Sequence, residues 1–218
     1  MVEKLVIVGM RAGGVELVEY IRHINKIEKR WEIIGFFDEN ESLKEYDGIP
    51  LLGSWDWVKN ANINEYKFII SIGNPLVKKR IATELREKFN VNFCNIVHPT
   101  AIVSKNAEIG EGNIIGPFSI IQPNVKLGNH IFIGPYVCIG HDSIIKDYCT
   151  LNAGSIISGY NIIKEMCYLG TGAKTIQKII MNESSLLGAG SVLYTNLEAY
   201  CSAKGVPAKV FFRRNLKI

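Results

Sequence analysis

The stretch that decides the fold is VCIGHDSIIKDYCTLNAGS, residues 137–155. Large aliphatic residues recur in it at an interval of six: Ile139, Ile145 and Leu151. A helix face repeats about every 3.6 residues and a strand face about every two. An interval of six therefore indicates a short structural unit that is itself repeated. His141 and Asp142 stand at the end of one such unit.

From residue 107 to residue 196 the chain divides into fifteen consecutive hexapeptides. The third place is Ile, Leu or Met in fourteen of them, with Thr175 as the exception, and the first place is a smaller residue in thirteen. Alternate residues of a strand point to the same side, so both places are expected to point inward. Three such strands close a triangular coil of eighteen residues, and five coils stack as a solenoid.

Glycine occupies the fourth place of seven hexapeptides. Because glycine adopts unusual backbone angles at little steric cost, we expect the corner of each coil to require such angles at this place.

The first 97 residues instead alternate strand-like and helix-like segments. Apolar runs predict four strands, at residues 3–9, 32–38, 67–73 and 91–97. Amphipathic periodicity predicts two helices, at residues 14–26 and 75–88. This order is typical of a small parallel sheet with right-handed crossovers. We therefore expect an α/β domain, residues 1–97, and a second domain with a C-terminal tail, residues 98–218.

Ligands of such sheets bind beyond the carboxyl ends of the strands. Here these ends carry a glycine-rich turn, a carboxylate and a second turn: Gly9, Met10, Arg11, Asp38, Gly73 and Asn74. The first turn reads GMRAGG, which is not the GxGxxG dinucleotide fingerprint. Taken alone, these residues fit ordinary turns and caps as well as they fit a ligand site.

Composition excludes several classes of protein. The chain has no run of 18 apolar residues and no basic segment ahead of a long apolar one, so we expect no membrane span and a cytoplasmic location. Five cysteines without a CxxC pair or a zinc-like spacing indicate reduced thiols and no metal site. A net charge of +4 is too small to indicate a nucleic-acid partner.

Several motifs together resemble a known family. The uninterrupted hexapeptides and the closing GVPAK, residues 205–209, are similar to the left-handed parallel β-helix of the acyltransferases. An α/β domain with IVG, FFDE and SIGN, ahead of a β-helix with GHD, resembles the sialic acid O-acetyltransferase and nucleotide amino-sugar N-acetyltransferase family, which includes the bacillosamine and perosamine enzymes. The resemblance implies a homotrimer with acetyl-CoA in grooves between adjacent β-helices and no metal.

The resemblance also implies roles for individual residues. His141 would be the general base, and Asp142 would orient it. The strand-end residues given above would bind a nucleotide-linked amino sugar. Acetyl-CoA would contact residues along the β-helix and the closing motif: Thr150, Gly159, Gly170, Gly188, Gly205, Pro207 and Lys209. The chain departs from the family pattern at Ala12 and Gly13, at Gly134, and at Thr150, where relatives have a second histidine.

The chemistry of the residues agrees with a base at His141. It occupies a corner place, and stacking puts Gly159, which has no side chain, on the next coil. An imidazole accepts a proton near neutral pH, and a neighbouring carboxylate fixes its tautomer. We expect His98 to be a structural residue at the domain junction. His130 is expected at a solvated corner, and His23 on the surface of a helix. Cys149 takes an inward place, which argues against a nucleophile there.

These observations predict an acetyl-CoA-dependent N-acetyltransferase that acts on a nucleotide-linked 4-amino-4,6-dideoxy sugar by direct attack on the thioester. Two alternatives stay open, namely O-acetylation of sialic acid and a non-catalytic β-helix scaffold. The residues do not distinguish UDP, dTDP and GDP as the nucleotide.

Overall fold

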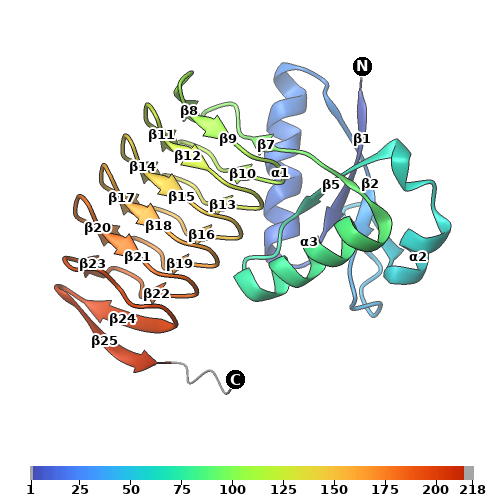
Figure 1. Cartoon of the computed structure of the whole chain (residues 1–218). Helices are drawn as coiled ribbons and strands as arrows, with labels where there is room; N and C mark the ends of the chain where they lie inside the picture. The colour runs from blue at the N-terminus through green and yellow to red at the C-terminus, as the bar shows by residue number, and fades with distance from the viewer. Residues whose placement is uncertain (1, 214–218) are drawn as a thin grey trace.

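The computed structural model describes residues 2–213. Figure 1 shows an α/β domain, drawn in blue to green, beside a column of stacked coils that runs from green to red. None of the helices in this part of the chain is long and apolar enough to cross a membrane.

A six-stranded sheet forms the centre of the α/β domain. Its strands, in spatial order, are β3 (Glu45–Tyr46), β4 (Ile49–Gly53), β2 (Trp31–Phe37), β1 (Glu3–Val8), β5 (Tyr66–Ile70) and β6 (Asn92–Phe93). Only the pair β3–β4 is antiparallel, and the other neighbours confirm the expected parallel sheet. The β3–β4 hairpin, α2 (Trp55–Asn60) and the 3₁₀ helix η1 (Ile63–Glu65) are too short to show a periodicity in the sequence.

Two helices cover the two faces of this sheet. α1 (Ala12–Ile27) packs on the face to which Ile7 points, and α3 (Pro75–Phe89) packs on the face to which Val8 points. Both helices match the predicted segments to within a few residues. Because β1 is buried on both sides, its apolar residues are continuous rather than alternating.

The expected strand at residues 91–97 is two strands in two different sheets. β6 closes the α/β sheet, whereas β7 (Ile96–Val97) opens the first coil by pairing with β10. The chain turns at Asn95, whose side chain donates to Gly110 O (2.7 Å) and accepts from Asn113 N (2.8 Å). The coil thus begins before residue 107, and the division of the chain at residues 97 and 98 remains a prediction.

The coils form a parallel β-helix with three faces, as the hexapeptides predict. The first face contains β7, β10 (Ile114–Ile115), β13 (Phe132–Ile133), β16 (Thr150–Leu151), β19 (Tyr168–Leu169), β22 (Leu186–Leu187), β24 (Cys201–Gly205) and β25 (Ala208–Arg213). The second face contains β8 (Ile102–Val103), β11 (Ile120–Ile121), β14 (Cys138–Ile139), β17 (Ile156–Ile157), β20 (Lys174–Thr175) and β23 (Val192–Leu193). The third face contains β9 (Glu108–Ile109), β12 (Lys126–Leu127), β15 (Ile144–Ile145), β18 (Ile162–Ile163) and β21 (Ile180–Met181).

The inside of the coil confirms the pattern of the sequence. Residues pair with those eighteen positions later, as Ile139 does with Ile157. Side chains of the first and third hexapeptide places form one buried core, with Val137 and Ile139 both fully buried. Cys149 also points inward and is fully buried, as expected.

The prediction of unusual backbone angles at the fourth place is wrong. Positive φ angles occur at the sixth place instead, for example at Tyr136 (57°) and Tyr148 (62°). The fourth-place glycines serve close approach between coils: a Cβ on Gly140 would lie 2.5 Å from Gly159 N. A side chain there would collide with the backbone of the next coil.

Candidate functional site

His141 and Asp142 form a hydrogen-bonded pair at the corner between β14 and β15. His141 Nδ1 lies 2.8 Å from Asp142 Oδ2, and the two side chains are 43% and 33% exposed. Asn124, on the preceding coil, donates to the other Asp142 oxygen across 3.0 Å. The backbone N–H of His141 donates to Gln122 Oε1 across 3.0 Å. The preceding coil therefore fixes both members of the pair.

Electrostatics determine which imidazole nitrogen is free. Two hydrogen bonds lower the pKa of Asp142 below its ordinary value. The bond from His141 has the larger effect and the bond from Asn124 the smaller one. The carboxylate accepts the proton on Nδ1, so the neutral imidazole keeps a lone pair on Nε2. His141 is thus oriented to accept a proton at Nε2.

Gly159 leaves that nitrogen open. A Cβ on Gly159 would lie 2.8 Å from His141 Nε2, so any other residue would press against the ring. The Tyr160 ring stands edge-on to the imidazole, with centroids 5.0 Å apart. The expected open corner with a glycine stacked beside it is confirmed.

A separate cavity of about 710 Å³ lies at the carboxyl edge of the α/β sheet. Four of the six residues expected to bind the nucleotide sugar line it: Gly9, Arg11, Asp38 and Gly73. Asp38 accepts from Met10 N and from Asn40 N, each across 2.8 Å, and thereby holds the glycine-rich turn. We call this cavity the first pocket.

The other two expected residues do not line the first pocket. The Met10 side chain is 6% exposed and belongs to the core, so only its backbone faces Asp38. Asn74 caps α3, since its Oδ1 accepts from Leu76 N (3.0 Å) and Val77 N (3.2 Å).

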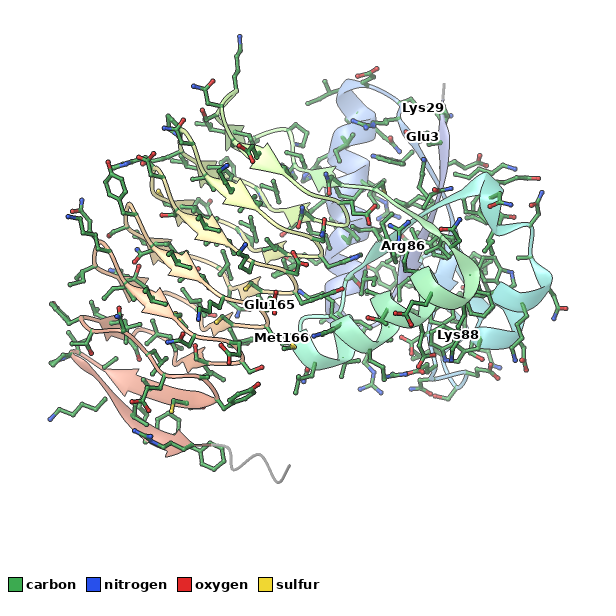
Figure 2. The ribbon with its side chains drawn as sticks, viewed as in Figure 1. Glu3, Lys29, Arg86, Lys88, Glu165 and Met166 are labelled. Carbon is green, nitrogen blue, oxygen red and sulfur yellow. The ribbon has the colours of Figure 1, made fainter. Side chains whose placement is uncertain are left out.

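A second pocket, of about 580 Å³, lies between the start of α3 and the first face of the β-helix. Asn74, Pro75 and Leu76 form one wall, and residues of the coils form the other. Figure 2 labels Glu165 and Met166 at the end of a coil beside the start of α3. Gly73 lines both pockets.

Thr150, which is expected to contact acetyl-CoA, lies against the α/β domain in this structure. Thr150 is 1% exposed, and its Oγ1 donates to Gly73 O across 2.8 Å while accepting from Lys78 Nζ across 3.1 Å. The Thr150 hydroxyl therefore makes hydrogen bonds that join the β-helix to the α/β domain. Lys78 escaped notice because a lysine in an amphipathic helix is normally a solvated residue.

The other histidines behave differently from one another. His98 is buried and contacts His23 Nδ1 (2.8 Å) and Thr100, which confirms its structural role. His130 is 5% exposed and stacks on Tyr148 with centroids 5.4 Å apart, so the expected solvated corner is wrong. The α/β domain covers this corner.

The remaining residues expected to contact acetyl-CoA follow the coils away from the α/β domain. Gly159 and Gly170 are buried between coils, and Gly188 is partly buried. The residues of the closing motif are exposed on the β24–β25 hairpin: Gly205, Pro207 and Lys209. His141 lines neither pocket, because both pockets lie against the first face or the α/β domain. Within residues 2–213, no three His, Cys, Asp or Glu side chains gather as metal ligands.

Comparison with known proteins separates the same two regions. Residues 4–85 match the family model of the PglD N-terminal domain. Residues 106–137 and 124–159 match that of the bacterial transferase hexapeptide, six repeats. A 50-residue segment is 44% identical to UDP-N-acetylbacillosamine N-acetyltransferase of Bacillus subtilis (strain 168), and this match spans 23% of each chain.

Solved structures share the whole fold. The acetyltransferase domain of PglB from Neisseria gonorrhoeae FA1090 superposes with a TM-score of 0.88 at 23% identity, covering 96% of this chain and all of that one. PerB from Caulobacter crescentus, in complex with CoA and GDP-perosamine, superposes with a TM-score of 0.87 at 22% identity, covering 97% and 99%. Residues 4–85 thus match the PglD N-terminal domain and residues 106–159 match the bacterial transferase hexapeptide, the combination that the sequence resembles.

Proposed function

We propose that this protein is an acetyl-CoA-dependent N-acetyltransferase of a nucleotide-linked 4-amino-4,6-dideoxy sugar. The observation that carries the proposal is the His141–Asp142 pair, with Nε2 open above Gly159. The bacillosamine N-acetyltransferase supports it as a relative over a short segment. The PglB domain, solved with acetyl coenzyme A, and PerB support it through the shared fold.

The reaction needs one proton acceptor. The amine nitrogen of the sugar attacks the thioester carbonyl of acetyl-CoA, so that an N–C bond forms and the C–S bond breaks. His141 Nε2 takes the proton that the nitrogen sheds, and the CoA sulfur leaves as a thiolate that is protonated afterwards. Asp142 stabilises the imidazolium that forms in between.

The backbone beside the base supplies the oxyanion donor. Gly159 N–H donates to no backbone acceptor in the described part of the chain. An N–H aimed at the thioester oxygen stabilises the negative charge that develops during attack. We assign this role to Gly159.

The first pocket would hold the nucleotide. Arg11 is exposed at its edge and suits a diphosphate, because a guanidinium binds phosphate oxygens in a bidentate manner. Asp38 keeps acceptor capacity beyond its two backbone hydrogen bonds, which suits a ribose or base donor. Gly13 and Gly14 are packing residues, since a Cβ would lie 2.3 Å from Ser71 O and 2.0 Å from Gly9 O, respectively.

Within a single chain, His141 does not line the first pocket. We propose that a homotrimer brings the first pocket of one chain and His141 of another together. The second face carries exposed isoleucines that solvent does not favour: Ile102 (64%), Ile120 (38%) and Ile156 (40%). Phe118 and Tyr136 stack at its edge and are also exposed. Such a face fits association with another copy, which would place acetyl-CoA between β-helices.

Acceptor screening tests the proposal. Acetyl-CoA is supplied with UDP-, dTDP- and GDP-linked 4-amino-4,6-dideoxy sugars, and separately with sialic acid, while free thiol is followed. We expect turnover of one nucleotide amino sugar. Turnover of sialic acid alone would establish the O-acetyltransferase instead, and no turnover with any acceptor would leave the scaffold.

A further inference from the structure

We propose that Asn124 and Tyr160 are positioning residues for proton transfer. Each comes from a coil next to that of the His141–Asp142 pair, and together they hold the pair from both sides. This inference rests on the proposed function, because it concerns how the base of that reaction keeps its orientation.

Asn124, Asp142 and Tyr160 form a ladder at one corner of the β-helix. They occupy the sixth place of hexapeptides that follow one another at intervals of eighteen residues, and their φ angles are 60°, 58° and 61°. Backbone bonds keep the coils in register there. Asp142 N donates to Pro123 O across 3.1 Å, and Tyr160 N donates to His141 O across 2.9 Å. Because the backbone angles are the same, the three side chains leave the corner in the same direction.

Asn124 holds the carboxylate oxygen that His141 does not use. Its Nδ2 donates to Asp142 Oδ1 across 3.0 Å, whereas His141 Nδ1 lies 2.8 Å from Asp142 Oδ2. The amide has to present its nitrogen, because its oxygen would repel the carboxylate. With one donor at each oxygen, the carboxylate cannot rotate without breaking a hydrogen bond. Oδ2 therefore stays beside Nδ1.

The same bonds keep Asp142 ionised. The pKa of Asp142 is lowered below its ordinary value first by the bond from His141, next by the bond from Asn124 and last by a bond from the Tyr160 hydroxyl. A carboxylate that stays charged accepts the Nδ1 proton and leaves the lone pair on Nε2. The ladder thus acts on the tautomer of the base as well as on its position.

Tyr160 bounds the imidazole along its length. Its backbone follows Gly159, whose added Cβ would lie 2.8 Å from His141 Nε2, and its hydroxyl bonds Asp142 at the Nδ1 side. The ring therefore crosses the histidine from Nε2 to Nδ1, with the two planes at 88° and the centroids 5.0 Å apart. A ring in this position limits rotation of the imidazole and leaves the other side of Nε2 to the acceptor amine.

Neither side chain is needed for the fold. Both are exposed at the corner, Tyr160 by 51%. Within residues 2–213 the Asn124 side chain bonds no residue other than Asp142. Hydrogen bonds at an exposed site add little to stability, because water replaces them. Loss of these contacts should therefore change turnover and leave the melting temperature nearly unchanged.

One substitution at two places of the same corner tests the role of Asn124. Asn124→Asp keeps the size of the side chain and suits the φ of 60°, but it replaces the donor by a second carboxylate. Asn106→Asp is the matched control, since Asn106 is exposed at the same place one coil further from Asp142. We expect kcat of Asn124→Asp to fall about tenfold with little change in KM for either substrate, and Asn106→Asp to match the wild type. Equal kcat values in the two variants would overturn the role of Asn124.

A double-mutant cycle separates positioning from a structural effect. Asn124→Gly should lower kcat of the wild type by roughly three- to tenfold, the usual effect of one lost hydrogen bond. In the Asp142→Gly background no carboxylate remains to be held, so the same substitution should cost nothing further. Equal losses in both backgrounds would show that Asn124 does not act through Asp142.

Two substitutions divide the role of Tyr160. Tyr160→Phe keeps the ring and removes the hydroxyl, so kcat should fall by only about two- to threefold. Tyr160→Asn suits the φ of 61° and removes the ring, and we expect a loss of about tenfold or more. Tyr200→Asn is the control, because Tyr200 has a φ of 59° at another corner. Equal losses in Tyr160→Asn and Tyr200→Asn would contradict the role of Tyr160.

The tautomer of His141 gives a readout that needs no substrate. Heteronuclear NMR of the imidazole nitrogens should show neutral His141 protonated at Nδ1 in the wild type, and an increased share of the Nε2-protonated form in Asn124→Gly. If the wild type turned over no acceptor, the proposed function would fall, and this measurement would decide the positioning role by itself. The same tautomer in both proteins would overturn that role.

Discussion

Lys78 Nζ donates to Thr150 Oγ1 across 3.1 Å, and this bond joins α3 to the first face of the β-helix. The amine also donates to Cys149 O across 3.1 Å, and no carboxylate pairs with it within residues 2–213. Burial therefore lowers the pKa of Lys78 to about 7. The contact between the domains depends on an amine that is partly neutral near neutral pH.

Substitution Lys78→Met should remove a pH dependence of stability. Between the folded pKa of about 7 and the ordinary value of 10.5, the unfolded chain binds more protons than the folded one. The free energy of unfolding of the wild type therefore rises with pH across this window, by about 1 kcal/mol per pH unit. Urea unfolding at pH 7, 8 and 9 measures the rise, which should be much smaller in Lys78→Met.

The neighbouring lysine is the control for this experiment. Lys79 is exposed on the same helix, so Lys79→Met should keep the wild-type slope. Equal slopes in the wild type and in Lys78→Met would mean that the amine is solvated and does not join the domains.

Protonation of His130 should lower the free energy of unfolding at acidic pH. Burial of the imidazole lowers the pKa of His130 from 6.5 to about 4, and the positive charges of Lys78 and Arg86 act in the same direction. The negative charge of Asp147 acts in the opposite direction. Between these values the unfolded chain again binds more protons, so stability falls as pH drops from 6.5 to 4, by up to about 3 kcal/mol. His130→Asn suits the φ of 54° at this position and should have a flatter profile between pH 6.5 and 5.

His130, Thr150 and Lys78 have an environment that the sequence pattern does not predict. The hexapeptide period is local, so it predicted the coil, its inward residues and the open corner at His141. The docking of the α/β domain is not local. It buries the corner that holds His130 and the hydroxyl of Thr150, and it turns Lys78 inward, although none of the three has a sequence pattern that marks it as buried. The angles at the sixth place escaped prediction because glycine stands there in only four of the fifteen hexapeptides, fewer than at the fourth place.

Assembly should depend on the second face of the β-helix. We expect light scattering to give three times the chain mass of 24.4 kDa. Ile156→Lys puts a charge on that face, where the wild-type side chain is 40% exposed, and should dissociate the trimer and abolish turnover. Ile27→Lys is the control, since Ile27 is 75% exposed at the end of α1. An active monomer at micromolar concentration would contradict the proposed site between copies.

Removal of the base should reduce turnover without affecting cosubstrate binding. His141→Ala deletes the proton acceptor, and we expect kcat to fall by roughly a hundredfold or more while affinity for acetyl-CoA barely changes. Asp142→Asn should cause a smaller loss, because an amide no longer fixes the Nδ1–H tautomer. Near-normal turnover in His141→Ala would exclude the histidine as the base.

Gly159→Ala tests the open corner itself. The added Cβ would lie 2.8 Å from His141 Nε2, and its three nearest neighbours are all atoms of that movable ring. The backbone of Gly159 does not adopt a positive φ, so alanine causes no strain and the melting temperature should change little. We expect turnover to fall at least about tenfold, because displacement of the imidazole by an ångström disrupts proton transfer. In the His141→Ala background the same substitution should cost little more, since the ring that it displaces is gone. Equal losses in the two backgrounds would show that Gly159 acts independently of the histidine.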